Sequence, residues 1–275
     1  MTADVPRPLR RRWWLTALGF LFAALAVTAV AARQLGTAAA VRWLAVAAVP
    51  LGYALWLLRD SLTANRPPAE LEPDEPTAAD GGARVVPTFG LANAVTLARG
   101  WLYAGVAGFL LVVPAAGSGW RWLPVAWYGT GAALDWVDGA LARTVGRPSR
   151  LGARLDLAFD TLGFLVAPLV AVAWGRLPVW YLSLSAARYL FKLGCWTRRR
   201  RGLPVGELPE SSVRRPLAGL QMAFITAALL PVVPVGPLRV AAALVLLPSL
   251  AVFARDYLVV AGYVGEANCH TDSAR

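Results

Sequence analysis

The sequence has few of the residues on which soluble enzymes rely. Only 16% of its 275 residues are charged and 57% are hydrophobic, whereas about a quarter of the residues of a soluble domain are charged. One histidine, His270, lies in a polar C-terminal stretch, which argues against histidine catalysis and a histidine-rich metal site. The two cysteines, Cys195 and Cys269, provide no disulfide framework. These shortages exclude a soluble or disulfide-stabilised domain and predict an integral membrane protein.

The charge that is present is mainly basic. The formal net charge is +11, and the chain contains 12 tryptophans. This combination is typical of a helical bundle whose aromatic residues lie at the membrane interfaces and whose loops face an anionic cytoplasmic leaflet. Nucleic-acid binding is the weaker interpretation of the same charge, and we expect no nucleic-acid partner.

Apolar segments follow one another along the chain, each near the roughly 20 residues that a helix needs to cross a bilayer. Charged residues, proline or glycine separate them. The eight segments are 13–32, 39–58, 91–113, 122–142, 151–174, 178–196, 216–233 and 238–262. The sequence therefore predicts an all-α polytopic membrane protein.

One stretch rich in proline and acidic residues divides the segments into two groups. Such a composition cannot bury a core and is typical of a solvated linker. The predicted organisation is two N-terminal transmembrane helices in 1–59, a cytoplasmic linker in 60–87, a six-helix membrane domain in 88–262 and a polar cytoplasmic tail in 263–275. The sequence suggests no role for the two extra helices or the linker.

The distribution of basic residues predicts the orientation in the membrane. With the N-terminus in the cytoplasm, five of the 27 basic residues fall in or beside outer loops, two lie inside a segment, and 20 lie on the cytoplasmic side. Both termini are then cytoplasmic. The first segment has an alternative interpretation as a cleaved signal peptide, because Arg10, Arg11 and Arg12 precede it. Its long apolar stretch favours a retained helix.

Four carboxylates lie inside two consecutive apolar segments. Asp135 and Asp138 lie about 60° apart on one helix, and Asp156 and Asp160 about 40° apart on the next, so each pair occupies one face. The connecting loop is short, so we expect antiparallel neighbours whose acidic faces meet at one depth in the cytoplasmic half of the membrane. Each carboxylate there costs several kcal/mol unless it is compensated. The cluster therefore predicts hard divalent cations, Mg²⁺ or Mn²⁺, with two ions favoured.

A simpler interpretation is that each aspartate pairs with an arginine, for which Arg143 and Arg154 are available. Two such pairs would leave four carboxylates at one depth unexplained. Small residues accompany the aspartates: Gly139 and Ala142 share the stripe of Asp135, and Gly152 lies one turn before Asp156. They leave room for a ligand or for close contact between helices.

Residues 135–160 read DWVDGALARTVGRPSRLGARLDLAFD. They resemble the signature of the class I CDP-alcohol phosphatidyltransferase family, D-x2-D-G-x2-A-R-x8-G-x3-D-x3-D, at all eight fixed positions. A looser resemblance precedes this motif, because Asn93, Thr96 and Arg99 are similar to the N-x2-T-x2-R element of the family's first transmembrane helix. The usual PN before that helix is replaced here by the longer PTFGLAN. The resemblance covers residues 85–262 and implies a six-helix catalytic domain, a homodimer and a site open to the cytoplasm.

The resemblance also implies a reaction and a set of roles. A hydroxyl of an acceptor alcohol attacks the β-phosphorus of a CDP-linked lipid, and CMP leaves. Asp135, Asp138 and Asp156 would hold the metal, with Asp160 as a further ligand or the general base. Asp160 is the better candidate for the base because its estimated depth is greatest. The residues assigned to the CDP site are Gly139, Ala142, Arg143, Gly152, Asn93, Thr96 and Arg99.

Two further basic residues suggest the kind of acceptor. Arg188 and Lys192 lie four residues apart on one helix face, at the estimated depth of the aspartates. They favour a phosphorylated polyol such as glycerol phosphate or inositol phosphate over serine or a neutral lipid alcohol. Alternatively, Lys192 snorkels to the interface and Arg188 pairs with an aspartate.

Two other classes of protein also place acidic residues inside a membrane. An intramembrane prenyltransferase uses aspartate-bound Mg²⁺, but its two acidic motifs lie on well-separated helices. An ion or proton transporter would have discontinuous helices and polar residues near the middle of several segments. Both stay as alternatives to the phosphatidyltransferase.

Overall fold

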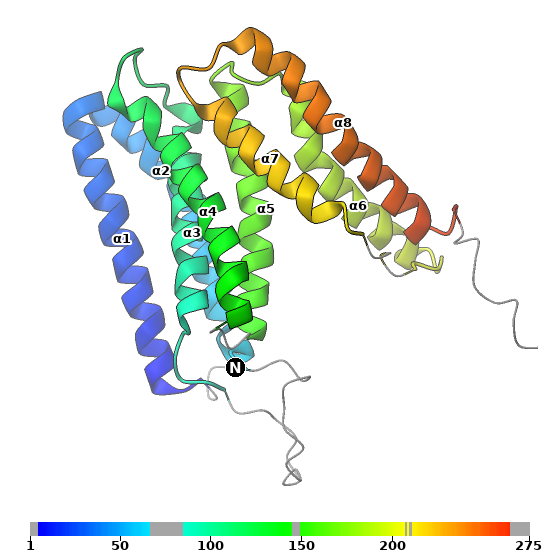
Figure 1. Ribbon diagram of the computed structural model, residues 1–275. Coiled ribbons are helices and arrows are strands. Elements are labelled where there is room, and N and C mark those ends of the chain that lie inside the picture. The colour runs from blue at the N-terminus through cyan, green and yellow to red at the C-terminus, as the bar shows by residue number, and fades with distance from the viewer. Residues whose placement is uncertain (1–4, 67–84, 145–148, 207, 209–210, 265–275) are drawn as a thin grey trace, which may run out of the picture.

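The computed structural model describes residues 5–66, 85–144, 149–206, 208 and 211–264, and for residues 137–144 it describes the backbone alone. Every regular element within these ranges is helical (Figure 1). The α-helices are α1 (Arg7–Leu35), α2 (Thr37–Asp60), α3 (Leu91–Ala107), α4 (Leu123–Thr144), α5 (Arg150–Ala173), α6 (Ser183–Arg200), α7 (Arg214–Leu229) and α8 (Val235–Val260). Short 3₁₀ helices are η1 (Leu62–Ala64), η3 (Gly108–Leu111), η4 (Gly119–Trp122) and η5 (Val179–Leu182). The predicted all-α fold is confirmed, with one helix for each apolar segment.

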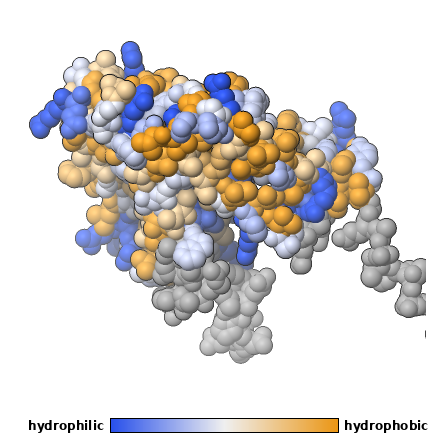
Figure 2. Space-filling view, turned by 45° about the horizontal axis from the view of Figure 1, so that its top comes forward, coloured by the Kyte–Doolittle hydropathy of each residue, from blue (hydrophilic) through white to orange (hydrophobic). Residues whose placement is uncertain are grey.

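Five of the described helical segments are long and apolar enough to cross a membrane. They are α1, α2, α5, α8 and the continuous stretch Leu91–Leu111 formed by α3 and η3. The α7 helix has only 16 residues, and α6 ends in a run of basic residues. Large apolar side chains such as Leu18 and Phe22 are exposed on α1, and apolar residues cover much of the face shown in Figure 2. A surface of this kind is stable against lipid and not against water, which supports a polytopic membrane protein.

The two N-terminal helices pack against the rest of the bundle. The α2 helix lies along α3 and η3, and α1 lies along α2 (Figure 1). Trp43 of α2 is fully buried, and its indole Nε1 donates a hydrogen bond of 3.1 Å to the carbonyl of Gly105 in α3. Trp120 donates a bond of 2.6 Å to Gln34 near the end of α1. The N-terminal pair is therefore part of the core and not a detached anchor.

The two ends of the predicted linker 60–87 are held beside the start of α5. The amide of buried Asn65 donates to the carbonyls of Val86 and Thr88, at 2.7 and 3.0 Å. The backbone N–H of Arg150 donates to the carbonyl of Arg66 at 3.1 Å. Most of the linker, residues 67–84, lies outside the described residues. Its two ends nevertheless meet close to the acidic motif.

The last three α-helices diverge from the first five (Figure 1). The α7 helix packs against α4 and α5 on one side and against α8 on the other, and α6 packs mainly against α8. A buried polar contact joins α7 to α8, since the Gln221 amide donates to the Val245 carbonyl and to the Ser249 hydroxyl. The Tyr181 hydroxyl in turn donates to Gln221. Each of these buried polar groups therefore has a partner.

Candidate active site

The α3 helix forms a wedge between α4 and α5. It packs along both, whereas α4 and α5 contact each other over only a short stretch. Glycines make the close approach of α3 to α5 feasible: a Cβ on Gly100 would lie 2.7 Å from the ring of Phe159. The predicted acidic faces of α4 and α5 therefore do not pack against each other along the length of the helices. They meet around side chains that α3 places between them.

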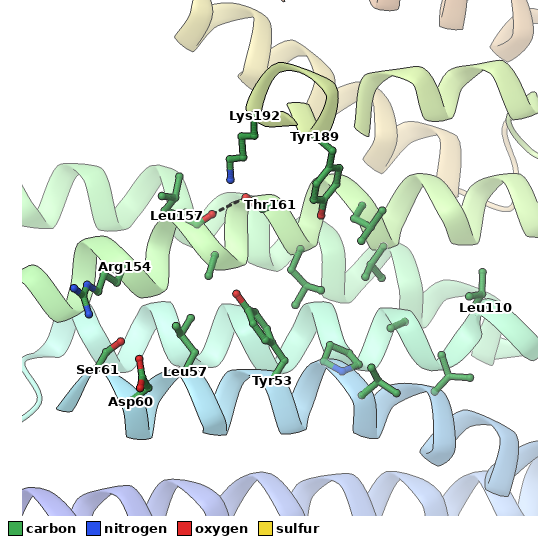
Figure 3. A pocket seen from close by; sticks show the side chains of 18 of the residues that line it. Tyr53, Leu57, Asp60, Ser61, Leu110, Arg154, Leu157, Thr161, Tyr189 and Lys192 are labelled. Atoms are coloured by element: carbon green, nitrogen blue, oxygen red, sulfur yellow. Dashed lines mark hydrogen bonds between the residues drawn. The ribbon is translucent and has the colours of Figure 1, made fainter. Parts of the chain in front are cut away.

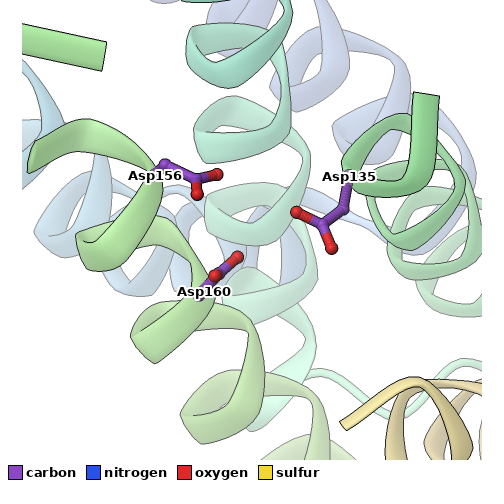
Figure 4. Close-up of side chains that lie close together, drawn as sticks. All are labelled: Asp135, Asp156 and Asp160. Atoms are coloured by element: carbon purple, nitrogen blue, oxygen red, sulfur yellow. The ribbon is translucent and has the colours of Figure 1, made fainter. Parts of the chain in front are cut away.

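Three carboxylates converge beside this wedge (Figure 4). Asp135 comes from α4, and Asp156 and Asp160 come from α5, with one oxygen of each lying within 4.8 Å of the others. Their side chains are 33%, 45% and 28% exposed, respectively. The cluster is thus accessible to a ligand and is not sealed in the core. Its predicted convergence is confirmed for these three residues.

Arg99 of α3 neutralises part of the negative charge of the three carboxylates. Its side chain is fully buried, and its guanidinium forms ion pairs of 2.8 Å to Asp135, 2.7 Å to Asp156 and 2.6 Å to Asp160. Nη1 donates to Asp156 and Nη2 to Asp160. The sequence suggests Arg143 and Arg154 as partners of the aspartates and, by resemblance, places Arg99 in the CDP site. In the described part of the chain Arg154 forms no ion pair, and Arg99 is the cation that the aspartates share.

The charge balance of the cluster favours a bound cation. Three carboxylates face one guanidinium, so two negative charges are left when all three aspartates are ionised. Carboxylate oxygens are the ligands that Mg²⁺ and Mn²⁺ prefer, and these oxygens are close enough to share one ion. The residues present therefore fit a divalent metal.

Tyr103, one helical turn after Arg99 on α3, lies between α4 and α5. The ring of buried Tyr103 lies between Gly131 of α4 and Gly163 of α5, where added Cβ atoms would lie 2.5 and 2.9 Å from it. Gly131 precedes Asp135 by one turn, and Gly163 follows Asp160 by three residues. Tyr103 thus fixes the separation of the two helices that carry the carboxylates. Sequence reasoning missed this residue, although its position four residues after Arg99 places it on the same face of α3.

The first turn of α5 is held by residues that were assigned to the CDP site. The Ser149 hydroxyl caps α5 by accepting a hydrogen bond of 3.0 Å from the N–H of Gly152. The amide of Asn93 donates to Ser149 at 3.3 Å, and a Cβ on Gly152 would lie 2.5 Å from the Asn93 oxygen. Gly152 is therefore required for close contact between α3 and α5. Thr96, also buried, donates to the carbonyl of Ala92 in its own helix.

The remaining predicted residues divide into two groups. Asp138, Gly139, Ala142 and Arg143 belong to α4, but their side chains lie outside the described residues. Arg188 and Lys192 lie on α6, half-buried and exposed respectively, and neither forms an ion pair with a described residue. Lys192 lines a groove on another side of α5. Their predicted contact with the acceptor stays a prediction.

The fold and the site define a carboxylate cluster on two helices of a helical membrane protein. The profile of a family described as CDP-alcohol phosphatidyltransferase matches residues 89–256. The chain belongs to this family, which confirms the resemblance and the predicted class of enzyme. Membership favours this class over a prenyltransferase or a transporter, and the match begins after α2.

The relatives found among curated proteins agree with the family. Proteins named "putative cardiolipin synthase" from Mycobacterium tuberculosis and Mycobacterium bovis are each 33% identical to the chain over 99 residues. The match covers 34% of this chain and 46% of theirs, so the chain spans about half the length of these relatives. No solved structure matches the chain significantly.

Proposed function

We propose that the protein transfers a phosphatidyl-type group from a CDP-linked lipid to an acceptor alcohol and releases CMP. The observation that carries the proposal is the set of three partly exposed carboxylates around one buried guanidinium. These four side chains lie within the matched residues 89–256, at positions that resemble the family's signature and first-helix element. A cluster with excess negative charge at the membrane boundary suits a metal-assisted displacement at phosphorus.

The aspartates would hold one or two Mg²⁺ or Mn²⁺ ions, with Asp135, Asp138 and Asp156 as the main ligands and Asp160 as an additional one. When bound, the metal neutralises the diphosphate and so lowers the barrier to attack by an oxygen nucleophile. Gly139, Ala142 and Arg143 would lie along the CDP moiety. For Arg99, the three ion pairs support a positioning role over direct contact with CDP.

Asp160 is the residue that we propose as the general base. It is the least exposed of the three described carboxylates, so the anion is the least stabilised by water. Its carboxylate accepts the proton of the acceptor hydroxyl as the new oxygen–phosphorus bond forms. The bond between phosphorus and the CMP oxygen breaks, and CMP takes the electron pair. The hydrogen bond from Arg99 Nη2 to one oxygen of Asp160 orients the carboxylate, so that its other oxygen can accept the proton.

The acceptor is proposed to be an alcohol that also carries a phosphate, such as a phosphorylated polyol. Arg188 is our candidate for holding that phosphate, because it lies half-buried on α6 without an ion pair to any described residue. The mycobacterial relatives are named for cardiolipin, a phospholipid. Their names support phospholipid synthesis here and leave the choice among phosphate-bearing acceptors to experiment.

The cellular arrangement is also part of the proposal. The basic residues at the end of α6 support a site that opens toward the cytoplasm of a multi-pass protein in the cell membrane, with both termini cytoplasmic. By analogy with the family, the protein would act as a homodimer. Membrane-impermeant labelling of Arg201→Cys, but not Ala116→Cys, in inverted vesicles of a background without native cysteines would test the orientation.

The assay that tests the function measures CMP release. Purified protein is incubated with a CDP-linked lipid, a panel of alcohols and Mg²⁺ or Mn²⁺. Asp135→Asn, Asp138→Asn and Asp156→Asn should each abolish turnover, as should EDTA. Asp60→Asn, an exposed carboxylate outside the matched region, is the control and should keep full activity. Full turnover in EDTA, or in the cluster variants, would contradict the proposal.

A further inference from the structure

A groove of about 1000 Å³ runs between α2, the α3–η3 segment, α5 and α6 (Figure 3). Its volume is at the upper end of the roughly 300–1,000 Å³ that is usual for ligand sites. Most of its wall is apolar, with Leu57 from α2, Leu110 from η3 and Leu162 from α5 among the lining residues. The α2 wall lies outside residues 89–256, which the family profile matches. The groove is therefore partly built from a segment that is additional to the family domain.

The groove is separate from the carboxylate cluster. Leu165 lines it, and nine residues of helix place this side chain about 180° around α5 from Asp156. None of the three clustered aspartates is among the residues that line the groove. The α5 helix thus divides two distinct sites.

The polar groups of the groove gather toward one end. Asp60 and Ser61 at the end of α2 and Arg154 near the start of α5 lie toward one end of the wall, and Lys192 reaches in from α6 near Leu157 and Thr161 (Figure 3). Neither Arg154 nor Lys192 forms an ion pair with a described residue, so their charges are available to a ligand. Beyond them the lining continues as Tyr53, Pro50 and aliphatic side chains. Two cations and the Asp60 carboxylate thus leave one net positive charge toward this end of the groove, and the rest of its length is apolar.

We propose that this groove binds an anionic phospholipid that is held and not consumed. The phosphate would lie between Arg154 and Lys192, and an acyl chain would lie along the wall formed by α2 and α5. An amphipathic ligand with one negative charge matches the distribution of charge and apolar surface, because a phosphate gains charge-assisted hydrogen bonds from two cations. The bilayer supplies such lipids at high concentration. The bound lipid would bridge α2 to α5 and α6.

The test measures retention of one probe by native mass spectrometry. The probe is phosphatidylmethanol, which carries one anionic phosphodiester and no hydroxyl, so it cannot serve as an acceptor. Phosphatidylcholine with the same acyl chains is the comparison lipid, and EDTA is present throughout so that the carboxylate cluster holds no metal. The wild-type protein should retain phosphatidylmethanol in preference to phosphatidylcholine.

Two variants of the groove and one control variant make the result specific. The double variant Arg154→Gln and Lys192→Gln should retain phosphatidylmethanol at least about tenfold less well, as expected for the loss of charged hydrogen bonds from two cations. Leu165→Trp, which fills the groove, should reduce retention of both lipids. Arg199→Gln, an exposed arginine on the same helix as Lys192 but not in the groove, should behave like the wild type.

Two outcomes would overturn the proposal. One is equal retention of phosphatidylmethanol by the wild type and the double variant. The other is a change in the ratio of monomer to dimer in these variants without a change in lipid retention, which would identify the groove as a contact between two copies of the chain. Neither measurement involves turnover, so failure here is distinct from failure of the proposed transferase reaction.

Discussion

The two sides of α5 contain charged groups in opposite arrangements. On one side, Asp156 and Asp160 face Arg99, which is buried and whose two Nη atoms form ion pairs with three carboxylates. On the other side, Arg154 and Lys192 border an apolar groove that Asp60 also lines, and neither cation forms an ion pair with a described residue. One side therefore attracts cations, and the other attracts an anion with an apolar tail.

The burial of each cation decides what it can do. Arg99 is inaccessible, so its interactions are fixed and its contribution is to hold the carboxylates in position. Lys192 is exposed, and a long side chain of this kind adapts to a mobile ligand. The same contrast distinguishes the rigid α3–α5 wedge, where glycines permit close packing, from the looser contact between α5 and α6.

Replacement of Arg99 by methionine should have the largest effect. Removal of Arg99 takes the shared cation away from three carboxylates, and because water reaches them in part, the cost is below the roughly 3–5 kcal/mol of a fully buried pair. Arg99→Met should therefore lower the melting temperature in detergent strongly and abolish CMP release, whereas Lys192→Met on the other side of α5 should leave the melting temperature close to that of the wild type. An unchanged melting temperature in Arg99→Met would show that the three ion pairs do not stabilise the fold.

A substitution at Asp160 should separate catalysis from binding. Asp160→Asn retains the size of the side chain but cannot accept the hydroxyl proton, so turnover should fall by about 10²-fold or more. Binding of the CDP-linked lipid in the presence of Mg²⁺, measured by equilibrium dialysis, should persist, whereas Asp156→Asn should weaken it. Near-normal turnover in Asp160→Asn would contradict its assignment as the general base.

The helices and the convergence of three aspartates can be predicted from the sequence. Eight apolar segments predicted the eight α-helices, because a bilayer imposes both the length and the apolarity of a spanning helix. The helical spacing of Asp135, Asp156 and Asp160 also predicted that they converge. These features depend on periodicity along one or two consecutive helices, which a sequence displays directly.

The features that sequence reasoning missed depend on how α3 packs between its neighbours. Arg99 had been assigned to CDP, and its triple ion pair follows only once α3 lies between α4 and α5. Tyr103 carried no signal of its own, because its role depends on Gly131 and Gly163 in two other helices. The groove combines helices from either side of the linker. Contacts between distant segments leave no local periodicity to interpret.

The separation of α4 and α5, which Tyr103 of α3 sets, is expected to be the next most sensitive to substitution. A side chain at Gly163 would collide with the Tyr103 ring, since a Cβ alone would lie 2.9 Å from it. Gly163→Leu should destabilise the protein by about 1–3 kcal/mol through overpacking and should reduce kcat by moving Asp160 relative to Asp135. Gly52→Leu, in open space on α2, is the matched control and should change neither quantity.

A second variant makes the spacing prediction specific. Combining Gly163→Leu with Tyr103→Leu removes most of the collision and should restore part of the stability, measured as the melting temperature in detergent. If the double variant is no more stable than Gly163→Leu, the Tyr103 ring does not set the separation of α4 and α5.

The smallest expected effects distinguish Arg188 from Lys192. Arg188→Ala should raise the KM for a phosphate-bearing acceptor by roughly tenfold, the loss expected for one charged hydrogen bond, and should leave the KM for the CDP-linked lipid unchanged. Lys192→Ala should change neither KM substantially if its partner is a lipid in the groove, because α5 separates the groove from the carboxylates. The measurement is initial CMP release at varied concentrations of each substrate in mixed micelles. An equal rise in acceptor KM for both variants would instead assign Lys192 to the acceptor site with Arg188 and would remove the contrast between the two sides of α5.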